Sequence, residues 1–472
     1  MSTSSSTPNL NKPAVQIPKP WLAMASLLIG AFVGMLSETS LNIALPKLMG
    51  AFNTGPATIQ WLVTGYMLVI GIILPFSSLI TKWFTTRKIV LFGLADFMVG
   101  AIISAVAPTF TVLLIGRMIQ GIATGLILPL MFTVALQIFP PAKIGGALGV
   151  CALVIMLAPA IGPTITGLVL GKLSWNWIFW LFIPFLAIGF ILALIGLKNI
   201  SSISRPKVDL LSLVESMVAF SCLVTGVSLA SDQGWGAWSV WLTLIVGTVV
   251  LFFYVHRQLN LTTPILNLKV FSKSAFIKGA ICVMVDFGVI LSAMYLLPQY
   301  IQKGMLLPVA LTGIIMLPGG IVNAIVSAWA GRLYDKVGAK IPATIGFGLA
   351  AIGVILLALG HHNSSIAYII CAHVILMVGC PLAMSPSQSL ALNSLSQFQS
   401  ADGSTILNTS QQIIGALATA LATSFLSWGQ KVFHGSSAFA FTNGVHYGMY
   451  FTLILTLIGL LCALTFKNNK ST

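Results

Sequence analysis

Carboxyl side chains are scarce in this chain, and four of its eight lie inside long apolar runs. These four residues are Glu38, Asp96, Glu215 and Asp286. An ionisable side chain in hydrocarbon costs several kcal/mol in most estimates, so it is retained where it handles a proton or balances an opposite charge. Each of the four is therefore a candidate functional residue.

Glu38 and Arg117 are predicted to share one depth in the membrane. They lie roughly 8 Å and 10 Å from the ends of their apolar runs, at a rise of about 1.5 Å per residue. Arginine keeps its proton, so Arg117 needs an acceptor. We predict that Glu38 is ionised while it is paired with Arg117 and protonated when a bound cation or a conformational change separates them. The alternative is a permanent structural pair between two helices.

Asp286 is predicted to lie near the bilayer midplane, about 16 Å along its run. No basic residue of that run shares its depth, and an unpaired carboxyl in apolar surroundings favours its neutral form. We predict that Asp286 exchanges a proton against a bound cation, although a structural hydrogen bond to a neighbouring helix is the alternative. His373 is a second candidate for proton handling because histidine titrates near neutral pH. Its alternative is a core hydrogen-bond donor.

The two remaining buried acids are given more local roles. Asp96 is expected in the inner half of its helix, where it can pair with Lys82 or Arg87. Glu215 is expected near the membrane interface, where contact with lipid headgroups accounts for it.

The elements that must position these residues are membrane-spanning helices. Of the 472 residues, 57% are hydrophobic and 7% charged, and the mean hydropathy is +1.01. A spanning helix needs roughly 20 mostly apolar residues. The sequence predicts an all-α integral membrane protein with fourteen spans: 21–43, 57–80, 89–107, 110–135, 144–171, 175–197, 208–230, 236–256, 275–299, 306–330, 341–360, 364–390, 402–428 and 444–466.

The net charge of +15 reflects membrane topology. Lys and Arg are concentrated in alternate connecting segments, as the positive-inside rule requires, which predicts that both termini are cytoplasmic. The excess charge is expected to contact anionic lipid headgroups, so no nucleic-acid partner is predicted. The six cysteines fall within the spans and are interpreted as small core residues, without disulfides or metal ligands.

An internal repeat divides the chain. The segment "GRLYDKVGAK" (331–340) is predicted to be a compact turn, and "SLITKWFTTRK" (78–88) is its counterpart one half-chain earlier. Spans 1 to 6 then correspond to spans 9 to 14, with spans 7 and 8 as an inserted hairpin. The expected organisation is a cytoplasmic tail (1–20), a six-helix bundle (21–200), the hairpin with its linker (201–274) and a second six-helix bundle (275–472).

Several motifs resemble those of the major facilitator superfamily. The turn resembles its gating-loop motif through Gly331, Asp335, Lys336, Gly338 and Lys340. The pattern from Leu113 through Arg117 to Gln120 and Gly121 is similar to its proton-associated motif. The stretch "APAIGPTITG" (158–167) is similar to its antiporter motif, carried by Pro159, Gly162, Pro163 and Gly167. There the prolines bend the helix and the glycines admit a close neighbour.

Four further segments resemble the fourteen-span drug:proton antiporters, the lincomycin-resistance type most closely. They are "ETSLNIALP" (38–46), "WLVTGY" (61–66), "WNWIFWLFIP" (175–184) and "ADGSTILNTSQQ" (401–412). The first gating loop departs from the family pattern, because Lys82 and Thr85 replace the usual acid and glycine. Asn176 replaces a usual arginine.

The resemblance implies a two-bundle major facilitator fold and proton-driven efflux of amphiphilic, cationic or neutral, drugs by alternating access. It implies a monomer in the bacterial cytoplasmic membrane, with small-molecule substrates and protons as partners and the proton gradient, with no cofactor, as the energy source. Arg87, Lys88 and Asp96 join the gating residues. The substrate cavity is expected to be lined by Trp61, Tyr66, Gln120, Met294 and Tyr295, through aromatic faces and flexible thioethers.

Other classes of function find little support in the sequence. The nearest approach to a phosphate loop, 166–173, lacks the first glycine and the hydroxyl residue that holds magnesium. No nucleophile–base set indicates a catalytic residue, no ligand cluster indicates a metal, and no repeated filter indicates a channel. The alternative function is proton-coupled transport of a single endogenous solute or lipid precursor.

Overall fold

The computed structural model describes residues 19–200, 203, 209–261, 264–433 and 437–467. Within this part of the chain, fourteen helices are long and apolar enough to cross a membrane, so the predicted number of spans is confirmed. Their bounds are α1 Pro20–Phe52, α2 Pro56–Trp83, α3 Thr86–Ala105, α4 Phe110–Ile138, α5 Pro141–Lys172, α6 Asn176–Gly196, α7 Leu210–Gln233, α8 Trp238–Asn260, α9 Ser274–Gln299, α10 Val309–Val337, α11 Lys340–Ala358, α12 Ile366–Asn393, α13 Gln397–Val432 and α14 Ser437–Leu464. A 3-10 turn, η1 (Leu268–Ser272), precedes α9, and a π-helical turn, η2 (Tyr300–Gly304), follows it.

Local signals account for several helix starts. Proline occupies the beginning of α1, α2 and α5, where its missing donor costs nothing. The side chains of Thr109 and Ser365 accept hydrogen bonds from the first turns of α4 and α12, at 3.4 Å and 3.2 Å.

The two predicted turns are shorter than expected. Helix α10 continues to Val337, so Gly331, Asp335 and Lys336 are helical, and only Gly338 and Ala339 separate it from α11. Gly338 has φ +75°, a left-handed conformation that glycine adopts without strain. In the first half, only Phe84 and Thr85 lie between α2 and α3. The prediction of compact turns over 331–340 and 78–88 was wrong because the helices extend past the apolar windows that defined the spans.

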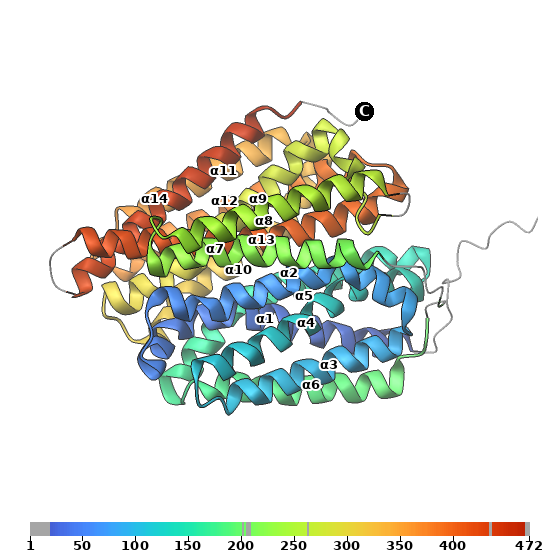
Figure 1. Ribbon diagram of the computed structural model, residues 1–472, viewed down its shortest axis with the longest axis horizontal. Helices are drawn as coiled ribbons and strands as arrows, with labels where there is room; N and C mark the ends of the chain where they lie inside the picture. The colour runs from blue at the N-terminus through green and yellow to red at the C-terminus, as the bar shows by residue number, and fades with distance from the viewer. Residues whose placement is uncertain (1–18, 201–202, 204–208, 262–263, 434–436, 468–472) are drawn as a thin grey trace, which may run out of the picture.

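The helices form two bundles with the same internal arrangement. Helix α1 packs against α4, α5 and α6, and α3 packs against α4 and α6. The second bundle repeats these pairings, since α9 packs against α12, α13 and α14, and α11 against α12 and α14. Figure 1 shows the two bundles as a lower, blue-green group and an upper, yellow-to-red group. The predicted correspondence of spans 1–6 with spans 9–14 agrees with this arrangement.

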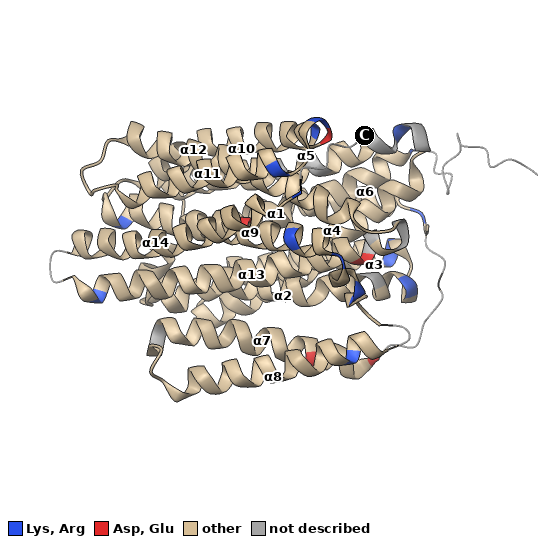
Figure 2. Cartoon of the chain, turned by 90° about the horizontal axis from the view of Figure 1, so that it is seen from above, with Lys and Arg blue, Asp and Glu red and all other residues tan. Residues whose placement is uncertain are grey.

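The most extensive contacts between the bundles are those of α5 with α10 and of α2 with α13, and α1 also packs against α9. The hairpin α7–α8 lies outside both bundles, and α7 contacts α13 and α2 (Figure 2). Helix α1 begins and helix α14 ends at the same end of the molecule, here called the terminal end, and Lys and Arg gather there (Figure 2). The other end is called the distal end.

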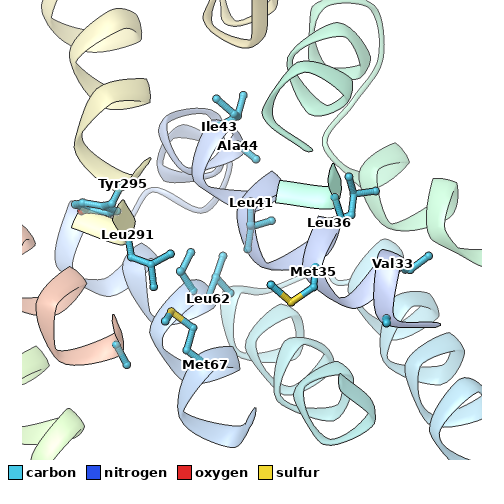
Figure 3. Packing of buried hydrophobic residues seen from close by; sticks show 14 of the residues in the cluster. Val33, Met35, Leu36, Leu41, Ile43, Ala44, Leu62, Met67, Leu291 and Tyr295 are labelled. Carbon is cyan, nitrogen blue, oxygen red and sulfur yellow. The ribbon is translucent and has the colours of Figure 1, made fainter. Parts of the chain in front are cut away.

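Apolar side chains from both bundles pack into one core. Met35 and Leu41 of α1 and Met67 of α2 belong to the same buried cluster as Leu291 and Tyr295 of α9 (Figure 3). The methyl group of Met67 and the side chain of Leu291 also meet at Gly415 of α13, where an added Cβ would lie 2.6 Å and 2.5 Å from them. Helices from the two halves therefore share a close-packed interior around the cavity described next.

Candidate functional site

A cavity of about 180 Å³ lies between the two bundles. Five helices line it, α1, α5, α9, α10 and α12, and five methionines make its wall deformable: Met35, Met294, Met316, Met377 and Met384. The lining extends toward the terminal end as far as Ser327 and Gln388. The cavity thus belongs to both halves of the repeat, which is where transporters with repeated halves bind substrate.

The helices α5 and α10 meet at backbone distance on the distal side of the cavity. An added Cβ at Gly313 would lie 2.7 Å from the carbonyl oxygen of Pro163, and one at Gly167 would lie 3.0 Å from that of Val309. A Cβ at Gly320 would lie 2.5 Å from the carbonyl oxygen of Ala160. The distal end is therefore closed along this seam.

The stretch 158–167 supplies both the cavity wall and the seam. Pro159 and Pro163 line the cavity. Gly162 faces α1 instead, where an added Cβ would lie 2.6 Å from Oγ1 of Thr39. Gly167 contacts α10. The two prolines of the motif thus face the cavity, while one glycine packs against α1 and the other against α10.

Glu38 is the acidic residue among those that line the cavity. Its side chain is 2% exposed, and its Oε2 atom has no hydrogen-bond partner among the described residues. Gln412, from α13 in the other bundle, is hydrogen-bonded to the carboxyl group. A carboxyl group that faces the cavity with one oxygen free of hydrogen bonds can bind a proton or a cation there.

Arg117 does not form the expected ion pair with Glu38. Its guanidinium donates to the hydroxyl and carbonyl oxygens of Ser37, to Oε1 of Gln120 at 2.8 Å and to the carbonyl oxygen of Leu62 at 3.1 Å. Successive residues on a helix point about 100° apart. Ser37 therefore faces α4 while Glu38 faces the cavity, and the shared depth that the sequence predicted does not make them partners in this structure.

The predicted substrate-cavity residues are mostly packed elsewhere. Among the described residues, the cavity lining includes Met294 but not Trp61, Tyr66, Gln120 or Tyr295. Tyr66 and Gln120 are fully buried beside Arg117. Tyr295 is fully buried in the hydrophobic core. Tyr66 and Gln120 contact the buried Arg117 instead of the cavity. The prediction that these four residues line the cavity was wrong in this conformation.

Asp286 lies directly behind the cavity wall. It is fully buried between α9 and α12, next to the Cys380 thiol, and neither carboxyl oxygen has a hydrogen-bonding nitrogen or oxygen partner among the described residues. Its chain neighbour Phe287 lines the cavity, as does Pro381, the neighbour of Cys380.

His373 lines the cavity from α12 with its ring 2% exposed. Its Nδ1 atom has no partner among the described residues, and the ring lies against Gly319 of α10 so closely that a Cβ there would overlap it. The histidine is thus held in place by packing.

The predicted gating residues lie at the terminal end, and the expected pair with Asp96 is absent. Arg87 donates to the carbonyl oxygen of Leu194 at 2.7 Å, which caps α6, and Lys88 is exposed. Asp96 is half-buried and faces the Ala123 backbone of α4.

Lys82 interacts with Asp402 of α13 across the two bundles. Asp335 and Lys336 are exposed on the last turn of α10, and Lys340 begins α11.

Sequence reasoning missed three amide side chains at the site. Asn323 and Gln388 line the cavity, and Gln412 bonds to Glu38. Amides carry no formal charge, so the search for charged groups inside apolar runs passed over them. In the described part of the chain, no group of three His, Cys, Asp or Glu side chains is placed to hold a metal.

Two bundles of repeated helices around a shared cavity, with a hairpin outside them, define a membrane transporter. The family described as Major Facilitator Superfamily matches residues 27–420, so the chain belongs to that superfamily and is a secondary transporter, not an enzyme. It moves small molecules across a membrane.

Two relatives named for lincomycin resistance match almost the whole chain. The Lincomycin resistance protein LmrB of Listeria monocytogenes is 40% identical over 460 residues, which cover 96% of this chain and 98% of that protein. The protein of the same name from Bacillus subtilis is 42% identical over 458 residues, covering 95% and 96%. With fourteen apolar helices and bacterial relatives, the chain is a multi-pass protein of the bacterial cytoplasmic membrane.

Solved structures share the fold at low identity. A POT family transporter in complex with 5-aminolevulinic acid superposes with a TM-score of 0.68 at 16% identity, covering 95% of both chains. A bacterial homolog of the human lysosomal transporter Spinster gives 0.66 at 13% identity, covering 95% of this chain and 96% of that one.

Proposed function

We propose that this protein exports amphiphilic drugs, cationic or neutral, in exchange for protons. The observation that carries the proposal is the cavity between the two bundles, in which Glu38 supplies the acidic side chain to a largely apolar, methionine-rich wall. Such a wall accepts apolar rings of varied shape, and one carboxyl group accepts either a proton or a cationic amine. The similarity to two lincomycin resistance proteins supports the same function.

Exchange at Glu38 couples the two fluxes. A proton and a cationic drug compete for one carboxyl group, so binding of one favours release of the other. Asp286, whose chain neighbour Phe287 lines the cavity, is proposed as a second proton site that becomes accessible when α9 or α12 moves. Both termini are proposed to be cytoplasmic, since the cationic residues gather at the terminal end. The cavity in this structure then extends toward the cytoplasm.

The proton gradient is sufficient as the energy source. One inward proton supplies about 2.3 kcal/mol per 100 mV of potential and about 1.4 kcal/mol per pH unit. Each 1.4 kcal/mol is tenfold in concentration, so one proton supports roughly a hundredfold gradient of a neutral drug. A monovalent cation exchanged for one proton moves no net charge, so the pH difference alone drives it.

Inverted membrane vesicles test the proposal. Respiration acidifies the vesicle interior, a pH-sensitive dye reports the gradient, and lincosamides or cationic amphiphiles are then added. The wild type should release protons when a substrate is added, and Glu38→Gln and Asp286→Asn should not. Glu215→Gln provides the matched control because this carboxyl lies within a span of the hairpin, outside the cavity. If no compound dissipates the gradient in the wild type beyond the Glu38→Gln level, drug:proton exchange is excluded.

A further inference from the structure

Two side-chain hydrogen bonds cross between the bundles at the distal end. Nε2 of Gln302, in η2, donates to the carbonyl oxygen of Ile43 on α1 at 3.0 Å. Oγ1 of Thr164, on α5, donates to the carbonyl oxygen of Gly313 on α10 at 2.9 Å. Each bond joins one half of the repeat to the other, and both lie beyond the cavity, away from the termini.

An unusual backbone segment holds Gln302 against α1. The π-helical turn η2 inserts an extra residue per turn at the end of α9, a feature that is rare and frequent at functional sites. Oη of Tyr300 anchors this turn by donating to the carbonyl oxygen of His361 at 2.7 Å. Leu306, shortly after it, has φ +58°, a left-handed conformation that is uncommon for leucine. Such a conformation persists where the surrounding structure enforces it.

The acceptor of this bond belongs to the helix that carries Glu38. Ile43 lies five residues after Glu38 and three before Pro46, inside α1. Pro46 has no N–H to donate to the carbonyl oxygen of Asn42 and bends the preceding turn, so Ile43 lies in a distorted part of the helix. The Gln302 bond therefore fixes the part of α1 next to the cavity relative to the second bundle.

The closed distal end also buries polar groups without partners. Among the described residues, Oδ1 of Asn42 and both amide atoms of Gln299, which lies beside the Tyr295 hydroxyl, are buried and lack well-formed hydrogen bonds. Asn42 precedes the acceptor residue by one position, and Gln299 lies three residues before Gln302. Buried unpartnered amides raise the free energy of the closed arrangement, and water would satisfy them if this end opened. The crossing hydrogen bonds offset that cost.

We propose that Gln302 and Thr164 are positioning residues of the transport cycle. Their bonds hold the distal end shut while the cavity extends to the terminal end, and both bonds break when the bundles rotate to expose the cavity on the distal side. This inference rests on the alternation that the proposed function requires, but not on the identity of the drug or on proton coupling.

Distances between spin labels test the inference directly. The labels are attached at Ala51 and Asn363, two exposed distal positions on opposite bundles, in a chain whose six cysteines are replaced by alanine. Gln302→Met keeps the length of the side chain and removes the donor. Lys303→Met makes the same replacement one residue later, and Lys303 has no role in the proposal. In lipid nanodiscs, Gln302→Met should raise the ratio of long to short distances about fivefold, as the loss of one net hydrogen bond predicts.

Two further variants sharpen the result. Thr164→Val, which removes the other donor with little change of shape, should shift the distances in the same direction, whether or not Gln302→Met folds. Gln302→Lys restores a donor and should return the ratio toward wild type. Distance distributions of Gln302→Met and Thr164→Val that match those of Lys303→Met would overturn the inference. These distances are measured without drug or gradient, so a failure of drug:proton exchange in vesicles leaves the result interpretable.

Discussion

The guanidinium carbon of Arg117 lies 4.1 Å from the centroid of the Tyr66 ring. The Tyr66 hydroxyl donates to the carbonyl oxygen of Gly34 at 2.9 Å and lies 2.7 Å from Oγ1 of Thr124, so the ring is fixed between α1 and α4. A fully buried cation is thus stabilised by an aromatic face, two carbonyl oxygens and neutral side chains, without an ion-paired carboxylate. This arrangement leaves the carboxyl group of Glu38 available to the cavity.

The Tyr66 ring is predicted to contribute more stability than its hydroxyl. Tyr66→Phe removes the hydrogen bonds but keeps the ring under Arg117, and should cost about 1 kcal/mol of unfolding free energy. Tyr66→Leu also removes the cation–π interaction and should cost about 2 kcal/mol more, because the site is desolvated. Thermal unfolding of the purified variants in detergent compares them. Equal destabilisation by Phe and Leu would show that the ring face contributes nothing to holding Arg117.

The sequence predicted the depth of Arg117 and Glu38 but not the direction in which each points. Depth follows from counting residues along an apolar run, whereas the facing partner depends on helix rotation, which a weakly amphipathic membrane helix does not encode. The spans and the repeat were predictable because they too follow from the positions and lengths of the apolar runs. The cavity wall was not, because an aromatic residue such as Tyr66 serves a buried cation as well as it serves a substrate.

Close packing of α5 against α10 is predicted to be required for transport. In Gly313→Ala, the added Cβ would lie 2.7 Å from the carbonyl oxygen of Pro163 and 2.8 Å from Cα of Thr164, so the two backbones must separate. Drug transport should fall about tenfold, which corresponds to roughly 1.4 kcal/mol lost from the closed seam. Gly348→Ala on α11 is the matched control, since no atom lies within 4 Å of an added Cβ there. Drug accumulation in inverted vesicles measures both variants, and equal rates would contradict a role for the seam.

The base of the hairpin is predicted to depend on pH through Asp209. Arg257 donates to both carboxyl oxygens of Asp209, at 2.6 Å and 2.8 Å, and these bonds hold the pKa of Asp209 well below its usual range. A lowered pKa in the folded state means that the pair stabilises the protein above the unfolded-state pKa of about 3.9 and ceases to do so as the pH falls below it. The effect should be small and salt-dependent because the pair is partly exposed.

Melting temperatures of the wild type and Asp209→Asn test this dependence. The wild type should melt higher at pH 7, and the difference should narrow only below about pH 4, where Asp209 of the unfolded chain becomes protonated while the folded carboxylate stays ionised. A difference that stays constant down to pH 3 would assign the effect to something other than the ionised pair.

The buried polar network at this site was also outside the reach of sequence reasoning. Gln412 lies in a segment that resembles a family motif, but its partner Glu38 is on the other side of a pseudo-symmetric interface and more than 370 residues away in the chain. Contacts of this kind depend on how two bundles dock. Sequence periodicity describes one helix at a time and carries no information about that docking.

The central claim is that Glu38 couples drug movement to proton movement, and purified protein in liposomes tests it most directly. Two assays are run on the wild type and on Glu38→Gln: exchange of labelled for unlabelled drug without a gradient, and drug accumulation driven by an imposed pH difference. The account predicts that Glu38→Gln retains exchange of a neutral drug within about threefold of wild type, since a neutral drug makes hydrogen bonds of similar net strength to an amide and to a protonated carboxyl group, but loses gradient-driven accumulation. Accumulation at the wild-type rate in Glu38→Gln would contradict it.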